Sequence, residues 1–442
     1  FPEEYHSRFF AGETGRRTLR VYNDQMAAGD FTLRWRVGGS GWQTRDFSLP
    51  PAGQRRETIE FNVPANAGAF PLDLELRAGS SLAYSNMLAC AAWPRPTLAL
   101  PAGVRLGLYD PPGATASLLG RFAVPFLLVT NLQTIAFGSI NVLMVGRHAL
   151  THEPVPEVGP DTRAAQWQAF AAKGGWVLIL EQTNYPSWLP AALQLSTLDA
   201  SFAFPNPDHA VTADLTAEDL RWWAPDHRLV THALRVPSRG NFRVLAAIGS
   251  TSGLEYAAAL EIPVGPGGWL ASQWLVSERF DAEPLAGALL QRLLDYCGPG
   301  QPRMVPRPAG LLAETNAPAA IVLAGLGLQA ENFLGRLSQC DPAIYPVLCL
   351  AGSNTVWEEA GAQLAHLTSY VERGGRLVLH RPSASFLAVA QPAWFPELEI
   401  AEADLSLVLR RELTNPAVRL SNHDLYWIEQ PGSWDNAEVL SN

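Results

Sequence analysis

Two stretches of the chain are similar to each other at a separation of about 200 residues. In each copy, a segment with helical periodicity ends at a Gly-Gly pair and continues into an apolar segment, at residues 166–180 and 363–379. An Asn-Pro turn and an Asp-Leu-aromatic cassette follow, at residues 206–222 and 415–427. Solenoid repeats are about 20–50 residues long. This much longer period therefore predicts two copies of one domain.

The composition is typical of several soluble domains. At 442 residues the length predicts about three domains, and a hydrophobic content of 48% is enough for buried cores. The formal net charge of -10 repels nucleic acid and anionic lipid, so we expect neither nucleic acid nor a membrane as a partner. No apolar run approaches the ~20 residues that span a bilayer. We therefore expect a soluble protein, either cytoplasmic or secreted.

The cysteines and histidines show no spacing typical of a metal or redox site. The four cysteines, which we expect to be free thiols, are Cys90, Cys297, Cys340 and Cys349. The three histidines that we considered as metal ligands are His209, His227 and His423. We expect no metal site and no cofactor. Because the chain begins at Phe1 without a signal-peptide pattern, we also expect it to be part of a longer protein.

Residues 1–97 are predicted to form an immunoglobulin-like β-sandwich. Apolar and polar residues alternate at residues 17–22, 31–37, 58–63 and 70–77, and turn residues separate these segments. Short, regularly spaced strands with one polar face are typical of such sandwiches. The predicted core contains Trp35, Phe47, Phe61 and Leu74.

Residues 104–298 are predicted to form an α/β domain. Apolar strands alternate with helices there, an order that indicates a parallel sheet covered on both faces. The expected strands and helices lie at residues 104–109, 114–122, 140–145, 161–172 and 176–180. Three further strands within residues 241–276 and a helix at residues 284–296 complete the domain.

Residues 317–442 are predicted to form a second, shortened copy of this domain. It opens with a strand at residues 319–323 and continues with a buried strand at residues 345–350. After the second cassette the sequence has no counterpart of the strands within residues 241–276. We therefore expect an incomplete sheet, with an edge that another segment covers.

Several short phrases resemble one enzyme family. Residues 8–13 (RFFAGE) and 21–24 (VYND) look like the segment that follows the catalytic barrel in family 2 glycoside hydrolases of the β-galactosidase type. Residues 107–111 (GLYDP), 174–178 (GGWVL) and 253–256 (GLEY) are similar to phrases of a later α/β region of such enzymes. In the family, that region resembles class I glutamine amidotransferases and a trimerisation domain.

The resemblance implies both a fold and a role. The expected fold is multidomain, with an immunoglobulin-like β-sandwich followed by two flavodoxin- or amidotransferase-like α/β domains of three layers, the second incomplete. The two catalytic carboxylates of such enzymes lie in a barrel that this chain does not contain. The resemblance therefore implies a non-catalytic accessory region of a glycoside hydrolase, with no catalytic residues of its own. Its expected partner is the barrel of the parent enzyme, with contacts between identical copies as a further role.

Two carboxylates are candidate site residues in the first α/β domain. Asp110 and Glu181 each follow a predicted parallel strand, at the edge where such folds bind ligands. They could hold sugar hydroxyls or a metal, or act in an independent hydrolase, while the alternative reading is a role in turns and helix caps. Cys349 superficially resembles a nucleophile on a sharp turn, but the repeat aligns it with Met144, a buried strand position.

An aromatic cluster is the other candidate site, and it predicts a carbohydrate-binding module as the alternative function. Indole and phenol rings can stack on the C–H faces of a sugar, while polar neighbours such as Asn184 bind its hydroxyls. The predicted carbohydrate-binding residues, with the two carboxylates, are Asp110, Glu181, Gln182, Tyr185, Trp188, Trp222 and Trp223. The competing interpretation is that the rings fill gaps between domains. Asp219 and Asp424, which are equivalent in the repeat, are expected to be structural.

Overall fold

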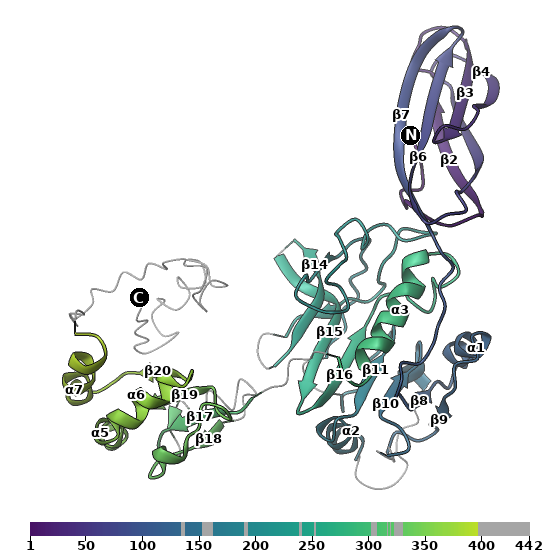
Figure 1. The fold of residues 1–442 in the computed structure, drawn as a ribbon. Helices are drawn as coiled ribbons and strands as arrows, with labels where there is room; N and C mark the ends of the chain where they lie inside the picture. Colours follow the sequence, from purple (N-terminus) through teal and green to yellow (C-terminus); the bar gives the residue numbers. More distant parts are fainter. Residues whose placement is uncertain are drawn as a thin grey trace. The chain divides into compact units, whose positions relative to one another are not determined.

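The computed structural model describes most of the chain and divides it into two compact units, Phe1–Pro306 and Arg307–Asn442 (Figure 1). The residues that it describes are 1–133, 138–152, 162–189, 193–237, 241–251, 253–301, 307–315, 317–318, 320–321 and 330–396. None of the helices formed by these residues is long and apolar enough to cross a membrane.

The first unit begins with the predicted β-sandwich. One sheet has the order β1-β7-β6-β3-β4, and the other pairs β2 with β5. Their bounds are β1 Arg8–Phe10, β2 Thr14–Tyr22, β3 Gly29–Val37, β4 Gln43–Leu49, β5 Gln54–Asn62, β6 Gly68–Ala78 and β7 Ser81–Trp93. Alternate residues of these strands face inward because side chains of a strand point to opposite faces. The four predicted core residues, Trp35, Phe47, Phe61 and Leu74, are all buried between the sheets.

The rest of the first unit is built on a nine-stranded sheet of order β12-β14-β15-β16-β11-β10-β8-β9, with β13 paired to β15. Its strands are β8 Leu106–Tyr109, β9 Leu127–Leu128, β10 Val142–Val145, β11 Trp176–Ile179, β12 Phe204–Pro205, β13 Leu234–Arg235, β14 Arg243–Ser250, β15 Gly253–Val264 and β16 Gly267–Ser272. The strands from β9 to β16 by way of β8, β10 and β11 are parallel. The other pairs are antiparallel.

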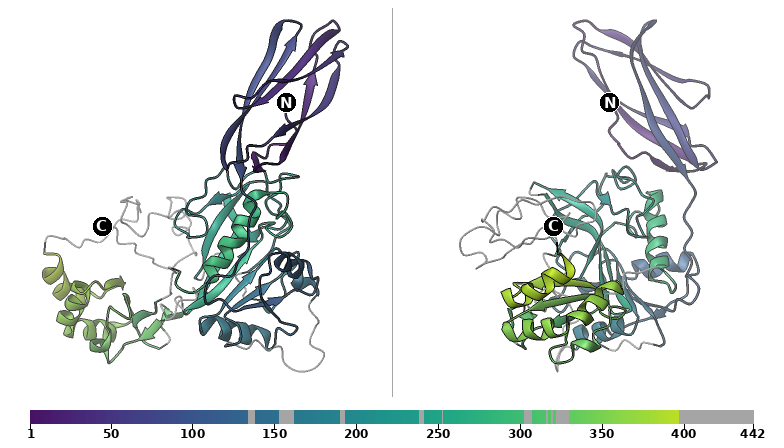
Figure 2. Two further views of the ribbon diagram at one scale, coloured as in Figure 1. Left: turned by 45° about the vertical axis from the view of Figure 1, so that its right-hand side comes forward. Right: turned by 60° about the vertical axis from the view of Figure 1, so that its left-hand side comes forward.

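Helices cover both faces of the parallel strands (Figures 1 and 2). They are α1 Ala114–Arg121, α2 Arg163–Ala172 and α3 Pro284–Cys297, with a short 3-10 helix η1 at Ala149–His152. Met144 and Leu178 share one core with residues of α1 and α3, whereas Leu143 and Val177 share another with residues of α2. Neighbouring residues of one strand thus point into cores on opposite faces of the sheet. Because helices pack on both faces, this part has three layers. The finer assignment to a flavodoxin- or amidotransferase-like fold remains a prediction.

The second unit contains a smaller parallel sheet of order β18-β17-β19-β20. Its elements are β17 Ala309–Leu312, β18 Ala330–Asn332, η2 Leu337–Gln339, β19 Val347–Ala351, α5 Asn354–Ala362, α6 Leu364–Glu372, β20 Arg376–His380 and α7 Ala384–Trp394. The strand predicted at residues 345–350 corresponds to β19.

The opening strand of this unit was placed wrongly by the sequence pattern. We predicted it at residues 319–323, but β17 lies earlier, at Ala309–Leu312, and the described residues 320 and 321 are helical. The unit accordingly begins before the predicted boundary at residue 317. A short apolar run rich in alanine carries no period that distinguishes a buried strand from a buried helix.

The repeat is visible as an identical helix-turn-strand connection in the two units. Gly174 ends α2 with φ +97°, and Gly374 ends α6 with φ +93°. The next residue in each copy, Gly175 or Gly375, donates its N–H to the carbonyl five residues back, at 3.0 Å in both cases. The second Asp-Leu-aromatic cassette, with Asp424 and His423, lies outside the described residues. The predicted incompleteness of the second sheet also depends on residues outside them.

Candidate functional site

The carboxyl ends of β8, β10 and β11 meet at one edge of the parallel sheet of the first unit. Asp110 directly follows β8, Gly146 directly follows β10, and Glu181 follows β11 after one residue. Open parallel sheets bind ligands at this edge. Both carboxylates are nevertheless buried, so their hydrogen bonds decide what they can do.

Asp110 fixes the start of α1. Its Oδ2 accepts the N–H of Ala116 at 2.7 Å, and its Oδ1 lies against the backbone of Gly146. Among the described residues no hydrogen-bond donor reaches Oδ1. Burial raises the pKa of this carboxyl, while the amides of Ala116 and Thr115 oppose that change. Asp110 therefore joins β8, α1 and the turn after β10.

Glu181 holds the turn that follows β16. Its Oε1 accepts the N–H groups of Ser277 and Glu278, each at 3.1 Å. Burial raises the pKa of Glu181 to about 7, against the opposing effects of these amides and the positive charge of Arg147. Arg147 in turn forms an ion pair with Glu278. The carboxylate thus connects the end of β11 to the segment after β16.

Gln182 is the centre of a buried polar network. Its Nε2 donates to the carbonyls of Gly146 and Leu180, both at 2.8 Å, and its Oε1 accepts the N–H of Leu150 at 3.0 Å. Its N–H donates to Gln273, whose Nε2 donates to the Tyr185 hydroxyl at 3.1 Å. Buried polar groups need such partners, so these hydrogen bonds hold the chain after β11 in a fixed position.

The three predicted tryptophans pack against different partners. Trp188 is half-buried and packs edge-on against Trp167, with 4.8 Å between ring centroids. Trp223 is fully buried, and its Nε1 donates to the carbonyl of Asp219 at 3.3 Å. Trp222 packs against Tyr5 of the N-terminal segment at 5.1 Å. Trp223 therefore fills a core, and Trp222 packs against the N-terminal segment.

Asp219 has the structural role that the repeat suggested. Its Oδ2 accepts the backbone N–H of Thr216 at 2.9 Å and the Thr216 hydroxyl at 2.7 Å. This arrangement closes a turn just before Trp222 and Trp223.

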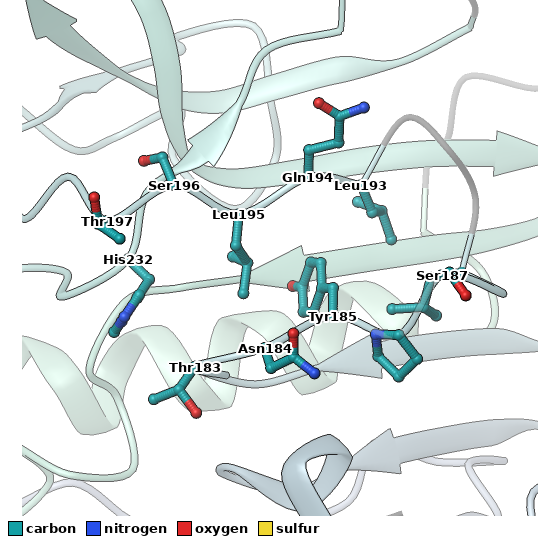
Figure 3. Close-up of a pocket in the computed structure, with 12 residues that line it drawn as sticks. Thr183, Asn184, Tyr185, Ser187, Leu193, Gln194, Leu195, Ser196, Thr197 and His232 are labelled. Atoms are coloured by element: carbon teal, nitrogen blue, oxygen red, sulfur yellow. The ribbon is translucent and has the colours of Figure 1, made fainter. Parts of the chain in front are cut away.

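A pocket of about 560 Å³ opens immediately after Gln182 (Figure 3). Two chain segments and one side chain from elsewhere form it: residues 183–187 with Leu189, residues 193–197, and His232. Of the predicted site residues, Tyr185 lines the pocket. In Figure 3, Leu193 and Leu195 extend from one segment toward Asn184 and Tyr185 on the other.

Sequence reasoning missed most residues of this pocket. Thr183 follows a parallel strand at the ligand-binding edge, so the rule that singled out Glu181 could have included it. The segment 193–197 and His232 carry no such signal, because they come from irregular chain between β11 and β13. Only the fold brings them to the end of β11.

The second unit has a counterpart of Asp110 that the sequence comparison overlooked. Glu314, just after β17, accepts the N–H of Ser353 at 3.1 Å and lies against Gly352, as Asp110 lies against Gly146. The counterpart of Glu181 is Arg381. Glu181 lies two residues after Ile179 of β11, and Arg381 lies two residues after the equivalent Leu379 of β20. The second unit thus keeps a carboxylate at the position of Asp110, displaced by one residue along the chain, but none at the position of Glu181.

Cys349 lies inside β19 and not on a turn. It pairs with Val378, as Met144 pairs with Leu178, so the predicted alignment with Met144 is confirmed. Burial raises the pKa of its thiol. Cys90, Cys340 and Cys349 are free thiols, as expected, and Cys297 is buried in α3. Within the described residues, no group of three histidine, cysteine, aspartate or glutamate side chains could hold a metal ion.

Comparisons with known proteins give partial similarities. No protein-family model and no curated protein sequence matches the chain. Solved structures that match include the β-galactosidase from Rahnella sp. R3, with 10% identity over 46% of this chain and 32% of that one and a TM-score of 0.28. The exo-β-1,4-mannosidase Op5Man5 from Opitutaceae bacterium strain TAV5 matches with 12% identity over 43% of this chain and 36% of that one, with a TM-score of 0.26.

A third match is the CARDB domain of the PF1109 protein from Pyrococcus furiosus. It has 12% identity, covers 21% of this chain and 89% of that one, and gives a TM-score of 0.19. The chain spans about a third of the length of the two glycoside hydrolases. Glycoside hydrolases are thus among the structural neighbours, at low identity and over part of the chain.

Proposed function

We propose that this chain is a non-catalytic accessory region of a glycoside hydrolase of the β-galactosidase type. Its β-sandwich and first α/β domain would act as one rigid support for the catalytic barrel of the parent enzyme. The observation that carries the proposal is the position of Arg8. This residue opens the RFFAGE phrase on which the family resemblance rests, and it connects the two domains.

Arg8 lies at the start of β1 and reaches the first turn of α3. Its Nε donates to the Glu283 carboxylate at 2.6 Å, and both side chains are buried. Its two terminal nitrogens donate to the carbonyls of Glu218 and Arg221, each at 2.9 Å. We call this arrangement the Arg8 joint. Because all three nitrogens of the planar guanidinium donate hydrogen bonds, the joint fixes orientation as well as distance.

Glu283 is equally constrained at the other side of the joint. It is the N-cap residue of α3 and accepts the N–H of Leu285 at 3.3 Å. Its second oxygen accepts the N–H of Ala224 at 3.1 Å. The same carboxylate therefore caps a helix, holds a loop and pairs with Arg8.

Other residues of the phrase and of the following linker strengthen the connection. Glu13 forms an ion pair with Arg95, whose guanidinium lies 4.2 Å from the Phe10 ring centroid. The backbone of Ala99 exchanges two hydrogen bonds with the Gln291 side chain of α3, at 2.9 and 3.0 Å. A linker held in this way transmits position from the sandwich to the α/β domain, which supports a scaffolding role.

The hydrolase alternative receives no comparable support. Asp110 and Glu181 are both engaged with backbone amides and are buried. A glycosidase instead needs two carboxylates that face one substrate-binding space. Their hydrogen bonds favour a structural role for both carboxylates.

The gene sequence upstream of the Phe1 codon tests the proposal directly. We expect it to encode an α/β barrel with two carboxylates at the carboxyl ends of its strands. A start codon with no such barrel upstream would contradict the assignment. A second test is to incubate this chain with chromogenic β-glycosides. We expect no turnover above buffer, and turnover that Asp110→Asn or Glu181→Gln abolishes would support the hydrolase instead.

A further inference from the structure

We propose that the pocket beside Tyr185 binds a neutral saccharide. This pocket is formed by residues 183–187 with Leu189, residues 193–197, and His232. The inference is independent of the accessory role proposed above. An accessory region could support a catalytic barrel without binding a saccharide, and this pocket could bind a saccharide without a catalytic barrel in the same protein.

The size and position of the pocket suit a small ligand. Its volume of about 560 Å³ falls within the range of roughly 300–1,000 Å³ that is common for ligand sites. It lies just beyond the carboxyl end of β11, where parallel sheets bind ligands. Buried hydrogen bonds of Gln182 and Gln273 hold the chain there in a fixed position.

The side chains of the pocket favour an uncharged ligand. Among the described residues that line it, none carries a carboxylate, an ammonium or a guanidinium group. Amide, hydroxyl and imidazole groups supply the polarity instead, from Asn184, Thr183, Ser187 and His232. A charged ligand would lose its hydration there without gaining an opposite charge, which is costly.

The pocket is mainly polar, and its apolar surface comes from half-buried Leu195 and Tyr185, whereas Leu193 is buried behind it. Leu193 and Leu195 extend toward the side of the pocket that carries Tyr185 (Figure 3). The Tyr185 hydroxyl is held at 3.1 Å by the Gln273 amide, so its ring has a fixed orientation. Each segment carries both apolar and polar side chains, and this mixture matches a sugar, which has C–H faces and a rim of hydroxyls.

The test measures binding of neutral saccharides to the full chain. Galactose, glucose, mannose, lactose and cellobiose are titrated by calorimetry and by saturation-transfer NMR, with glucuronate as a charged comparison. We expect saturable binding of at least one neutral sugar and none of glucuronate. Two variants probe the site: Asn184→Ala removes a hydrogen-bonding group at an exposed position, and Asn184→Trp fills the space.

The expected effects differ between the variants. Asn184→Ala should weaken binding about fivefold, the value of one neutral hydrogen bond, and Asn184→Trp should abolish it. Gln43→Ala, at an exposed position of the sandwich, should bind like the unchanged protein. Far-ultraviolet circular dichroism verifies that each variant is folded. The proposal is overturned if no neutral sugar binds at about 10 mM, if glucuronate binds equally well, or if Asn184→Trp leaves binding unchanged.

Discussion

Asp110 and Gly146 are in such close contact that a side chain at Gly146 would collide with the carboxylate. A Cβ atom there would lie 2.4 Å from Asp110 Oδ1. The second unit repeats the relationship, since a Cβ atom at Gly352 would lie 2.2 Å from Glu314 Oε2. Both copies therefore place a carboxylate directly against the glycine that follows the neighbouring parallel strand, β10 or β19.

We predict that Gly146→Ala destabilises the first unit by about 1–3 kcal/mol, the usual cost of overpacking. The added methyl group meets Asp110 and also Thr115 Oγ1, at 2.8 Å, and both are buried between rigid elements. Urea denaturation followed by tryptophan fluorescence measures the loss. Gly120→Ala is the matched control, because nothing lies within 4 Å of a Cβ atom at that helical position. It should be neutral or slightly stabilising, and equal losses in the two variants would contradict the packing argument.

The two glycines that end α2 and α6 should respond alike to substitution. Gly174 and Gly374 adopt nearly the same left-handed φ, and no atom lies closer than 3.8 Å to a Cβ atom at either. The cost of Gly174→Ala or Gly374→Ala is then purely conformational, about 1 kcal/mol each. Thermal unfolding of the unit that carries the change measures it. Asparagine at the same positions should cost less, and the idea fails if alanine is tolerated as well as asparagine.

The stability of the first unit should depend on pH through Glu181. Its pKa is raised from 4.5 to about 7, so between these values the folded protein holds a proton that the unfolded chain has released. The free energy of unfolding therefore falls as pH rises through this window. At 1.36 kcal/mol per pKa unit the decrease is on the order of 3 kcal/mol.

Glu181→Gln should remove this component of the pH dependence. The amide keeps an oxygen for Ser277 and Glu278 but does not ionise. The stability of the variant relative to the unchanged protein should therefore increase from pH 4.5 to pH 7, as measured by urea denaturation. Glu60→Gln, at an exposed carboxylate, serves as the control. Parallel pH profiles for the unchanged protein and Glu181→Gln would show that folding does not raise the pKa of Glu181.

Removing one partner of the Arg8 joint should cost about 3–5 kcal/mol, because it leaves the other charge buried and unpaired. We predict this loss for Arg8→Met and for Glu283→Gln. The double variant should lose less than the sum, since neither charge is then stranded. Chemical denaturation gives the free energies, and limited proteolysis of the linker at residues 94–101 reports separation of the domains. Additive losses would indicate that the two side chains do not act together.

Periodicity and turn residues predicted the elements that they govern directly. The alternation around Trp35 and Leu74 placed the sandwich core, and the Gly-Gly pairs placed the ends of α2 and α6. Both signals depend only on residues that are close together in the sequence, so they can be recognised without knowledge of the fold. The opening strand of the second unit was missed because the run at residues 319–323 has neither alternation nor a helical period.

The features that escaped prediction depend on contacts between distant parts of the chain. The pairing of Arg8 with Glu283 could not be foreseen, because the two residues lie 275 positions apart. Glu314 was missed because comparison at a fixed offset cannot detect a carboxylate that has moved by one residue. His232 reaches the pocket only through the path of an irregular segment. The sequence thus predicted the strand that leads to the pocket, whereas the other residues that line the pocket could be identified only from the fold.

The parallel pairing of β1 with β7 has a mechanical consequence. Arg8, Phe9 and Phe10 pair with Ala91, Ala92 and Trp93 in the same direction, so tension applied between the start of β1 and the end of β7 loads their hydrogen bonds in shear. Bonds loaded in shear share the force and must break together. The β1–β7 pair, at the end of the sandwich that leads into the α/β domain, should therefore need a larger force to separate than a hairpin whose hydrogen bonds break one at a time.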